Sequence, residues 1–139
     1  MTVVADVMTR DVQVVGEYET LVTAAERMRE SDVSALPICA EDGHVIGMLT
    51  DRDIVVKCIA EGAAAQDVVS GRLASGKVLA VSAHDTVEVV VRVMVDHRVW
   101  RLPVLDGIAL VGVISKADLI TVLPPAQLDE LVHAVNAAA

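Results

Sequence analysis

The chain has 139 residues, 54% of them hydrophobic, and a formal net charge of −9 at pH 7. This acidity disfavours nonspecific binding to nucleic acid or to anionic membranes, because both need basic patches. The mean hydropathy is +0.56, yet no apolar run approaches the roughly 18 to 20 residues that span a membrane. With no signal peptide visible at the N-terminus, we expect a cytoplasmic protein.

The first half of the chain predicts a helix between short strands. Leu21, Ala24, Ala25 and Met28 recur at helical spacing, and Thr20 is placed to be the N-cap of that helix. The predicted elements are a helical turn at 3–8, an extended segment at 12–15, a helix at 20–30, strands at 35–39 and 45–49, and a helix from 50 to 59.

The second half repeats this order and adds a terminal helix. Valines are poor helix formers, so the helix after Thr86 is predicted from burial and from the repeat rather than from propensity. The predicted helix at 116–123 ends at Pro124 and Pro125, and a terminal amphipathic helix follows these prolines. The predicted elements are a strand at 78–81, a helix at 86–97, strands at 100–105 and 109–114, a helix at 116–123, and a helix from about 128.

The two halves are an internal duplication. At an offset of 66 residues Thr20 matches Thr86, and Leu36-Pro37 matches Leu102-Pro103. From Gly47 onward the offset is 65, so one residue is lost between the paired strands, where hairpin loops vary in length. The duplication therefore predicts two related units and two related ligand clefts.

Each repeat contains the pattern Gly-x-x-Thr/Ser-x-x-Asp where a strand is predicted to run into a helix. A hydroxyl and a carboxylate beside unpaired helix amides suit a sugar that bears phosphate. The same residues also form capping boxes, a purely structural role. The use of Asp instead of Glu or Gln, and the preceding glycine, favour a ligand role. The residues are Gly47, Thr50 and Asp53 in the first repeat and Gly112, Ser115 and Asp118 in the second.

These motifs, together with the opening Asp6-Val7-Met8-Thr9, resemble a tandem CBS-domain pair, the Bateman module. The chain is most similar to small stand-alone actinobacterial CBS-pair proteins of the hypoxic-response-protein type. The resemblance implies an α/β (α+β) fold of two tandem β-α-β-β-α repeats packed with pseudo-two-fold symmetry, plus a C-terminal amphipathic helix. The expected boundaries are 1–62 for the first repeat, 63–76 for a connecting segment, 77–123 for the second repeat and 124–139 for the terminal helix.

The resemblance also implies a ligand site between the repeats. In the family the motif hydroxyl contacts a ligand phosphate and the aspartate holds ribose hydroxyls, roles that fall on Thr50, Asp53, Ser115 and Asp118. His97-Arg98 resembles a His-Arg pair that contacts nucleotide phosphates in some members. Arginine can hold a phosphate with paired hydrogen bonds, whereas the alternative for these cations is a solvated helix end. The implied ligands are AMP, ADP, ATP, NAD or S-adenosylmethionine, and no cofactor is required.

The first repeat departs from this pattern at one place. Ser31 and Asp32 stand where the second repeat has His97 and Arg98, and a carboxylate repels phosphate. Residues 1–66 carry 12 acidic and 5 basic side chains, against 8 and 6 in residues 67–139. We therefore expect a phosphorylated adenosine ligand to occupy the second cleft first.

The remaining reactive residues do not indicate catalysis, and their spacing does not indicate a metal site; a zinc site assembled in space from Cys and His is the lowest-ranked alternative. Cys39 is expected to end a strand and Cys58 to lie in a helix, both as buried thiols, and the spacing does not show whether they approach each other. His44, His84 and His133 lack the spacing of metal ligands. No Ser-His-Asp or Cys-His arrangement and no P-loop occurs in the chain.

The sequence thus predicts a non-enzymatic regulatory or sensor module that binds an adenosine-type nucleotide and signals through a change in shape or assembly. The alternative is a ligand-free dimeric interaction or scaffold protein, in which the two motifs act only as helix caps. In either case the valine-rich helices predict a homodimer. The chain carries no effector domain, so its output is expected to act in trans on another protein.

Overall fold

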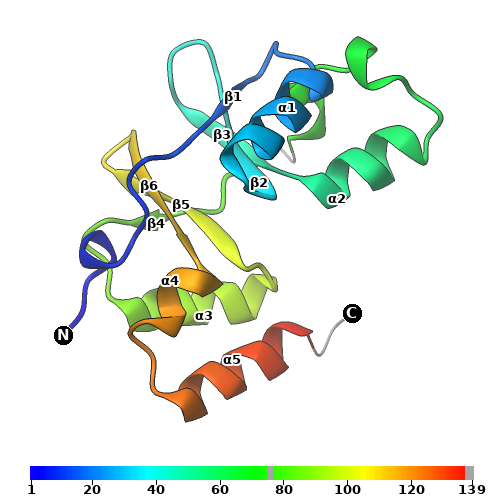
Figure 1. Ribbon diagram of the computed structural model, residues 1–139. Helices are drawn as coiled ribbons and strands as arrows, with labels where there is room; N and C mark the ends of the chain where they lie inside the picture. The colour runs from blue at the N-terminus through cyan, green and yellow to red at the C-terminus, as the bar shows by residue number, and fades with distance from the viewer. Residues whose placement is uncertain (75–76, 137–139) are drawn as a thin grey trace. The chain divides into compact units, whose positions relative to one another are not determined.

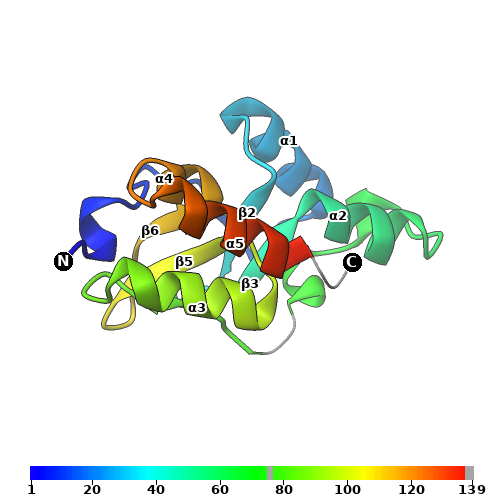
Figure 2. The ribbon, with the colours of Figure 1, turned by 90° about the horizontal axis from the view of Figure 1, so that it is seen from below.

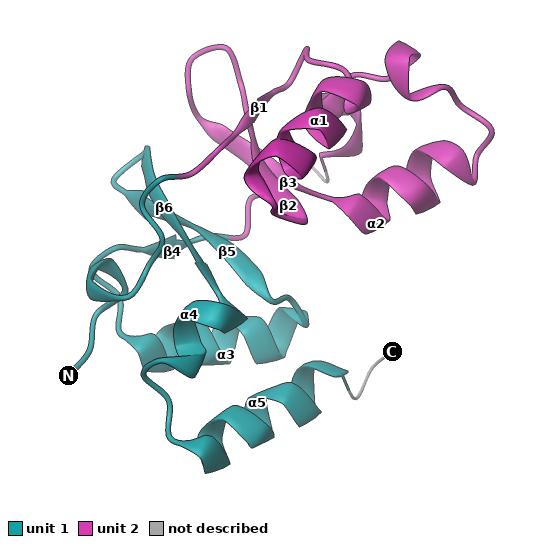
Figure 3. Cartoon of the chain, in the orientation of Figure 1, with its two compact units in different colours: residues 1–11, 80–139 teal, residues 12–79 magenta. Residues whose placement is uncertain are grey.

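The computed structural model describes residues 1–74 and 77–136 (Figure 1). The chain divides into two compact units (Figure 3). One unit comprises residues 12–79, and the other comprises residues 1–11 together with 80–139. We call them the first-repeat unit and the second-repeat unit, after the repeat whose sheet each contains. Each sheet has three strands, as the duplication predicts.

In the first-repeat unit, β1 pairs with β2 in parallel and β2 pairs with β3 as an antiparallel hairpin. Helix α1 contacts both β2 and α2. A π-helical segment continues α2, and two 3-10 turns follow it. The elements are β1 (Val15–Gly16), α1 (Leu21–Ser31), β2 (Ala35–Cys39), β3 (Val45–Thr50), α2 (Asp51–Ile54), the π-helical segment Val55–Ile59, and the 3-10 turns Ala65–Asp67 and Ser70–Leu73.

The second-repeat unit has the same strand order and pairing. Helices α3 and α4 cover one face of its sheet, and α5 packs against both helices (Figures 1 and 2). The elements are the 3-10 turn Val4–Asp6, β4 (Val81–Ser82), α3 (Val87–His97), β5 (Arg101–Asp106), β6 (Ala109–Ser115), α4 (Lys116–Ile120) and α5 (Pro125–Asn136).

The two long helices begin where the sequence predicts. The Thr20 hydroxyl accepts a hydrogen bond from the Thr23 amide at 3.3 Å, and the Thr86 hydroxyl accepts one from the Val89 amide at 3.4 Å. Both threonines have an extended backbone themselves, which is the usual geometry of an N-cap residue. The predicted helices at 20–30 and 86–97 are therefore confirmed.

Other elements are shorter in the structure than the sequence predicts. The extended segments at 12–15 and 78–81 form strands of only two residues, because only Val15–Gly16 and Val81–Ser82 reach the neighbouring strand. The helix after Thr50 changes to π-helical hydrogen bonding at Val55, and the Ala60 amide donates to the Val55 carbonyl at 2.8 Å. In the second-repeat unit α4 ends at Ile120 rather than residue 123.

The segment that precedes each repeat packs in the unit of the other repeat. The Val4 amide donates to the Asp85 carbonyl at 2.8 Å, and Val4 is completely buried in the second-repeat unit. Ser70, the repeat-related position, is completely buried in the first-repeat unit, and its amide donates to the Glu19 carbonyl at 2.7 Å. Residues 1–11 therefore pack in the unit of the second sheet, whereas residues 70–73, which follow the first sheet in sequence, pack in the unit of the first sheet.

Each unit has its own hydrophobic core. Leucine, isoleucine, valine and methionine fill both cores, so aliphatic packing supplies the burial that aromatic residues provide in many proteins. Within the described residues, no helix is both long enough and apolar enough to cross a bilayer. The largest fully buried side chains are Leu21, Leu36, Ile38, Leu49 and Val15 in the first-repeat unit, and Met94, Leu102, Ile114, Leu119, Leu131, Val4 and Val90 in the second.

Candidate functional site

Both predicted motifs lie where the last strand of a sheet runs into a short helix. Thr50 ends β3 and is the N-cap of α2, and Ser115 ends β6 and is the N-cap of α4. The hairpin register fixes their neighbours, because Thr50 lies opposite Ala35 and Ser115 lies opposite Arg101. The two strand-to-helix junctions therefore share a backbone arrangement and differ in the side chains around it.

In the first repeat the motif forms a complete capping box. The Asp53 amide donates to the Thr50 hydroxyl at 3.0 Å, and the Thr50 amide donates to Asp53 Oδ2 at 3.0 Å. The other carboxylate oxygen, Asp53 Oδ1, lies 3.4 Å from Lys57 Nζ, one helical turn further on. A cation thus lies beside the proposed sugar-binding carboxylate, which the sequence analysis did not anticipate.

In the second repeat three donors hold the aspartate. The Ser115 amide and hydroxyl donate to Asp118 Oδ2 at 2.9 Å and 3.2 Å, and the Thr9 hydroxyl donates to Asp118 Oδ1 at 3.1 Å. Val122 stands at the repeat position of Lys57, so the ammonium group of the first repeat has no counterpart here. The carboxylate is oriented by hydroxyl and amide donors rather than by an ion pair.

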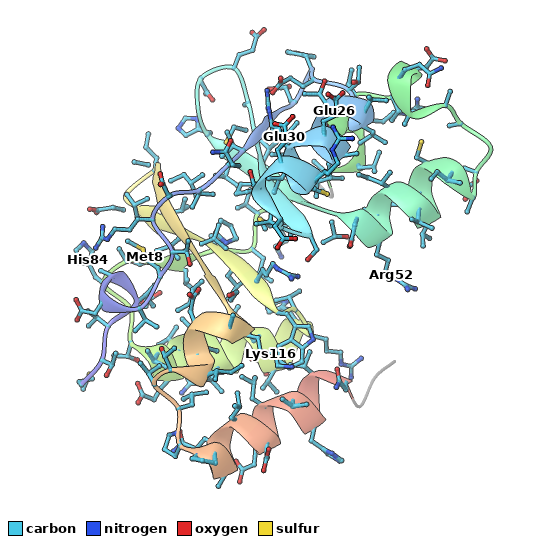
Figure 4. All side chains as sticks on the ribbon, in the orientation of Figure 1. Met8, Glu26, Glu30, Arg52, His84 and Lys116 are labelled. Atoms are coloured by element: carbon cyan, nitrogen blue, oxygen red, sulfur yellow. The ribbon has the colours of Figure 1, made fainter. Side chains whose placement is uncertain are left out.

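A pocket of about 280 Å³ opens beside Ser115 in the second-repeat unit. The ammonium group of Lys116, labelled in Figure 4, lies 5.0 Å from the centre of the Trp100 ring, within the range of a cation–π interaction. The pocket joins a hydroxyl, two cations and one aromatic ring, groups that suit a phosphorylated ligand with a ring system. Its lining residues are Trp100, Arg101, Ser115, Lys116, Ala117 and Ile120.

His97 and Arg98 lie at the C-terminal end of α3. His97 is the last helical residue, and Arg98 is the C-cap with a left-handed backbone (φ 56°). Both side chains are exposed, and neither is among the residues that line the pocket beside Ser115. Asp32 has the matching position and backbone (φ 53°) after α1, so the two repeats end these helices in the same way with opposite charges.

Sequence reasoning did not assign roles to Trp100, Arg101 and Lys116. The register of the predicted hairpin could have located these residues. Once Leu102 pairs with Ile114, Arg101 must lie opposite Ser115. The Lys116 amide then donates to the Trp100 carbonyl at 3.0 Å, which brings both side chains to the same end of the ladder. The equivalent residues of the first repeat are Ser34, Ala35 and Asp51, of which none is cationic or aromatic.

The two cysteines are free thiols in the first-repeat unit. As predicted, Cys39 ends β2, whereas Cys58 lies in the π-helical segment rather than in an α-helix. Cys58 is completely buried, but Cys39 is only half-buried, so the prediction of two buried thiols is wrong for Cys39. Burial raises the pKa of the Cys39 thiol, which disfavours its reactive thiolate form.

Two of the remaining histidines pair with carboxylates. His44 Nδ1 lies 2.6 Å from Asp42 Oδ2, and hydrogen bonds from the His44 backbone and side chain lower the pKa of Asp42. His84 Nε2 lies 3.3 Å from Asp106 Oδ1. Across residues 1–74 and 77–136, no three His, Cys, Asp or Glu side chains gather closely enough to hold a metal ion.

Comparison with known proteins identifies the family. The model of the CBS domain matches residues 4–59 and again residues 69–125, so two copies account for most of the chain. The chain therefore belongs to the CBS-domain family and contains a CBS pair, as its motifs predicted. This pair is a regulatory module, a class whose members are typically not enzymes.

Relatives of similar length support this assignment. Hypoxic response protein 1 of Mycobacterium tuberculosis is 42% identical over 135 residues, which cover 97% of this chain and 94% of that protein. The CBS domain-containing protein YhcV of Bacillus subtilis is 35% identical over 119 residues, which cover 86% of this chain and 84% of that protein.

Solved structures share the fold. The crystal structure of Hypoxic Response Protein I with two coordinated zinc ions has a TM-score of 0.82 and 43% identity, and the match covers 88% of this chain and 100% of that one. The crystal structure of CBSX2 in complex with AMP has a TM-score of 0.74 at 22% identity, and the match covers 87% of this chain and 95% of that one. The second likeness concerns the fold alone.

Proposed function

We propose that this chain is a nucleotide sensor, which binds an adenosine-type ligand at the strand-to-helix junctions and signals through a change in shape or assembly. In this proposal Asp53 and Asp118 hold ribose hydroxyls, while Thr50 and Ser115 contact phosphate. The second-repeat junction is the preferred site. The candidate ligands remain AMP, ADP, ATP, NAD and S-adenosylmethionine, which share the adenosine group.

The pocket beside Ser115 is the observation that carries this proposal. It places the motif hydroxyl next to Arg101 and Lys116, whose charges complement a phosphate, and next to the Trp100 ring. The AMP complex of CBSX2 supports the choice of ligand class, because that protein has the same fold. His97 and Arg98 stay candidates for phosphate contacts, as the sequence predicted.

A thermal-shift series with the five candidate ligands tests the proposal. A ligand present at about 100 times its dissociation constant adds roughly 2.7 kcal/mol to the free energy of unfolding, so the melting temperature should rise. Asp118→Asn is the control and should reduce the rise. Unchanged melting curves across all five ligands would refute nucleotide sensing.

The capping box of the first repeat favours a second candidate function, that of a ligand-free interaction module. Thr50 and Asp53 already satisfy each other's amides, which is all that a structural role requires. In this alternative the chain acts through its protein contacts, and Asp53→Asn would cost about 0.5 to 2 kcal/mol of stability without changing any affinity for nucleotide.

Both functions include a homodimer in our proposal. Apolar side chains are exposed on helical segments of each unit, and a dimer interface would bury them. Sedimentation at micromolar concentration tests this, and a monomer there would contradict it. These exposed apolar side chains include Val22, Val55, Val56 and Ile59 in the first-repeat unit and Ile120 in the second.

A further inference from the structure

The segment at Met8 and Thr9 lies along the edge strand of the second-repeat sheet. The Thr9 amide donates to the Val113 carbonyl at 2.9 Å, and the Val113 amide donates to the Thr9 carbonyl at 2.9 Å. This reciprocal pair is an antiparallel bridge to β6, and Met8, labelled in Figure 4, is buried beside it. The backbone of Thr9 is therefore fixed relative to the strand that ends at Ser115.

Gly112 permits this close approach. A Cβ atom at Gly112 would lie 2.7 Å from the Met8 sulfur and 2.7 Å from the Thr9 carbonyl oxygen, closer than real Cβ contacts. At the equivalent Gly47 the nearest atom would be the Ala74 Cβ at 3.3 Å, a much milder contact. The absence of a side chain at Gly112 thus sets how near Thr9 comes to the motif.

The Thr9 hydroxyl reaches the motif aspartate. It donates to Asp118 Oδ1 at 3.1 Å, whereas Ser115 supplies both donors to Oδ2. The terminal torsion of aspartate has a broad energy minimum, and rotation about it moves both oxygens, so each donor on either oxygen narrows the range of that torsion. A donor on the second oxygen restricts that rotation, and each oxygen keeps further capacity to accept hydrogen bonds.

We propose that Thr9 is a positioning residue for nucleotide binding, which orients the Asp118 carboxylate toward the ribose hydroxyls. This inference rests on the proposed nucleotide-sensing function. Thr9 itself does not contact the ligand in this proposal, and its effect passes through Asp118. In the first repeat the corresponding oxygen, Asp53 Oδ1, faces Lys57 instead, so the two sites orient their aspartates by different means.

Titration calorimetry with AMP and with 2′,3′-dideoxy-AMP tests this role. Thr9→Val keeps the branched shape of the side chain and removes the hydroxyl. We expect AMP affinity to fall about fivefold to tenfold, which is the usual effect of one hydrogen bond, while the affinity for the dideoxy analogue stays the same. The preference for AMP over its dideoxy analogue should therefore fall by the same factor.

Two further variants separate positioning from a general loss of structure. Thr9→Ser retains the donor and should restore the AMP preference. Thr2→Val makes the same chemical change at another exposed threonine of this segment and should leave both affinities unchanged.

The outcomes distinguish this inference from the proposed function. If the wild-type chain binds AMP and Thr9→Val keeps the wild-type preference, the positioning role is overturned while nucleotide sensing stands. An equal loss of affinity for both nucleotides would also overturn it, because that result indicates general distortion. If the wild-type chain binds neither nucleotide, the inference is overturned together with AMP binding at this site.

Discussion

The two repeats of this chain share a backbone and differ in the chemistry placed upon it. Their hairpins have register shifts at matching positions, between Ile38 and Cys39 and between Val104 and Leu105. Their long helices have threonine N-caps and end in left-handed residues, Asp32 in one and Arg98 in the other. The features that set the backbone path have therefore been kept in both copies.

The surroundings of the motif hydroxyl differ in charge. Ser115 lies beside Arg101 and Lys116, whereas the equivalent neighbours of Thr50 are Ala35 and Asp51. Arg101 and Lys116 attract phosphate, whereas Asp51 repels it. The cation of the first repeat, Lys57, lies beside Asp53 instead. The comparison teaches that a duplicated fold can keep the same backbone motif in both copies while the charges beside the motif diverge.

The largest expected effect comes from removing the charge of one motif aspartate. Asp118→Asn should weaken AMP binding about 10-fold to 100-fold, because hydrogen bonds to a charged acceptor are the stronger kind. Asp53→Asn is the matched variant in the first repeat, and it should leave the affinity for the first AMP molecule bound unchanged. Titration calorimetry measures both, and a greater loss with Asp53→Asn would reverse the order of the two sites.

The next largest effect concerns stability. Gly112→Ala should lower the free energy of unfolding by about 1 to 3 kcal/mol, because the new methyl group overlaps the backbone of Thr9 as well as the Met8 side chain. Gly47→Ala should cost less, since its nearest contact is the Ala74 methyl group at 3.3 Å. Urea unfolding of both variants gives the comparison, and equal losses would show that the two segments pack equally tightly.

A smaller effect tests which cation contacts phosphate. Arg101 lines the pocket beside Ser115 and Arg98 does not, so we expect Arg101→Ala to lower AMP affinity about tenfold and to weaken its dependence on salt. The sequence-based hypothesis assigns this role to Arg98. A larger loss with Arg98→Ala would favour that hypothesis, and adenosine without phosphate serves as the control ligand.

The smallest expected effect is a pH dependence of stability that arises from Glu19 in the first-repeat unit. Glu19 accepts hydrogen bonds from the Arg27 guanidinium, at 2.7 Å to Nη2, and from the Gly16 amide at 2.8 Å. Both sets of hydrogen bonds lower the pKa of Glu19; those from Arg27 have the larger effect, and the one from Gly16 has the next largest. Asp85 has the same position in the second repeat, but Val93 replaces the arginine.

The sign of this pH dependence follows from the lowered pKa. The stabilisation is present above the unfolded-state pKa of about 4.3 and is lost as the pH falls through the lower pKa of the folded state. Glu19→Gln should flatten the acid limb of the stability curve and cost less than about 1 kcal/mol at neutral pH, because the pair is partly exposed. Thermal melts from about pH 6 to about pH 3 measure this, and an unchanged acid limb would contradict it.

Local signals were sufficient to predict much of the fold. Helical spacing and a threonine cap located α1 and α3, and turn residues located the hairpins, because these elements are stabilised by neighbours in sequence. The same reasoning predicted β1 and β4 to be longer than they are, because the length of a short parallel strand depends on how far its partner strand extends. The change to π-helical bonding at Val55 had no counterpart in the sequence pattern.

The candidate site was predictable only in part. The repeated hydroxyl and aspartate stood out because two copies of one motif are improbable by chance. Trp100, Arg101 and Lys116 could have been found from the register of the hairpin, which the pattern already contained. The contact from Thr9 to Asp118 spans 109 residues, and no local rule connects two such positions.

The exchange of leading segments between the repeats has a consequence for the order of folding during synthesis. Residues 1–11 are made first, but they pack with residues 80–139. They therefore have no sheet to pack against until more than half of the chain has been synthesised, whereas the sheet of residues 12–79 can form earlier. Contacts between such distant residues slow folding, because a long loop has to close before they stabilise anything. We expect the N-terminal segment to dock last, so the arrival of Thr9 beside Asp118 would complete the second site only once synthesis is nearly finished.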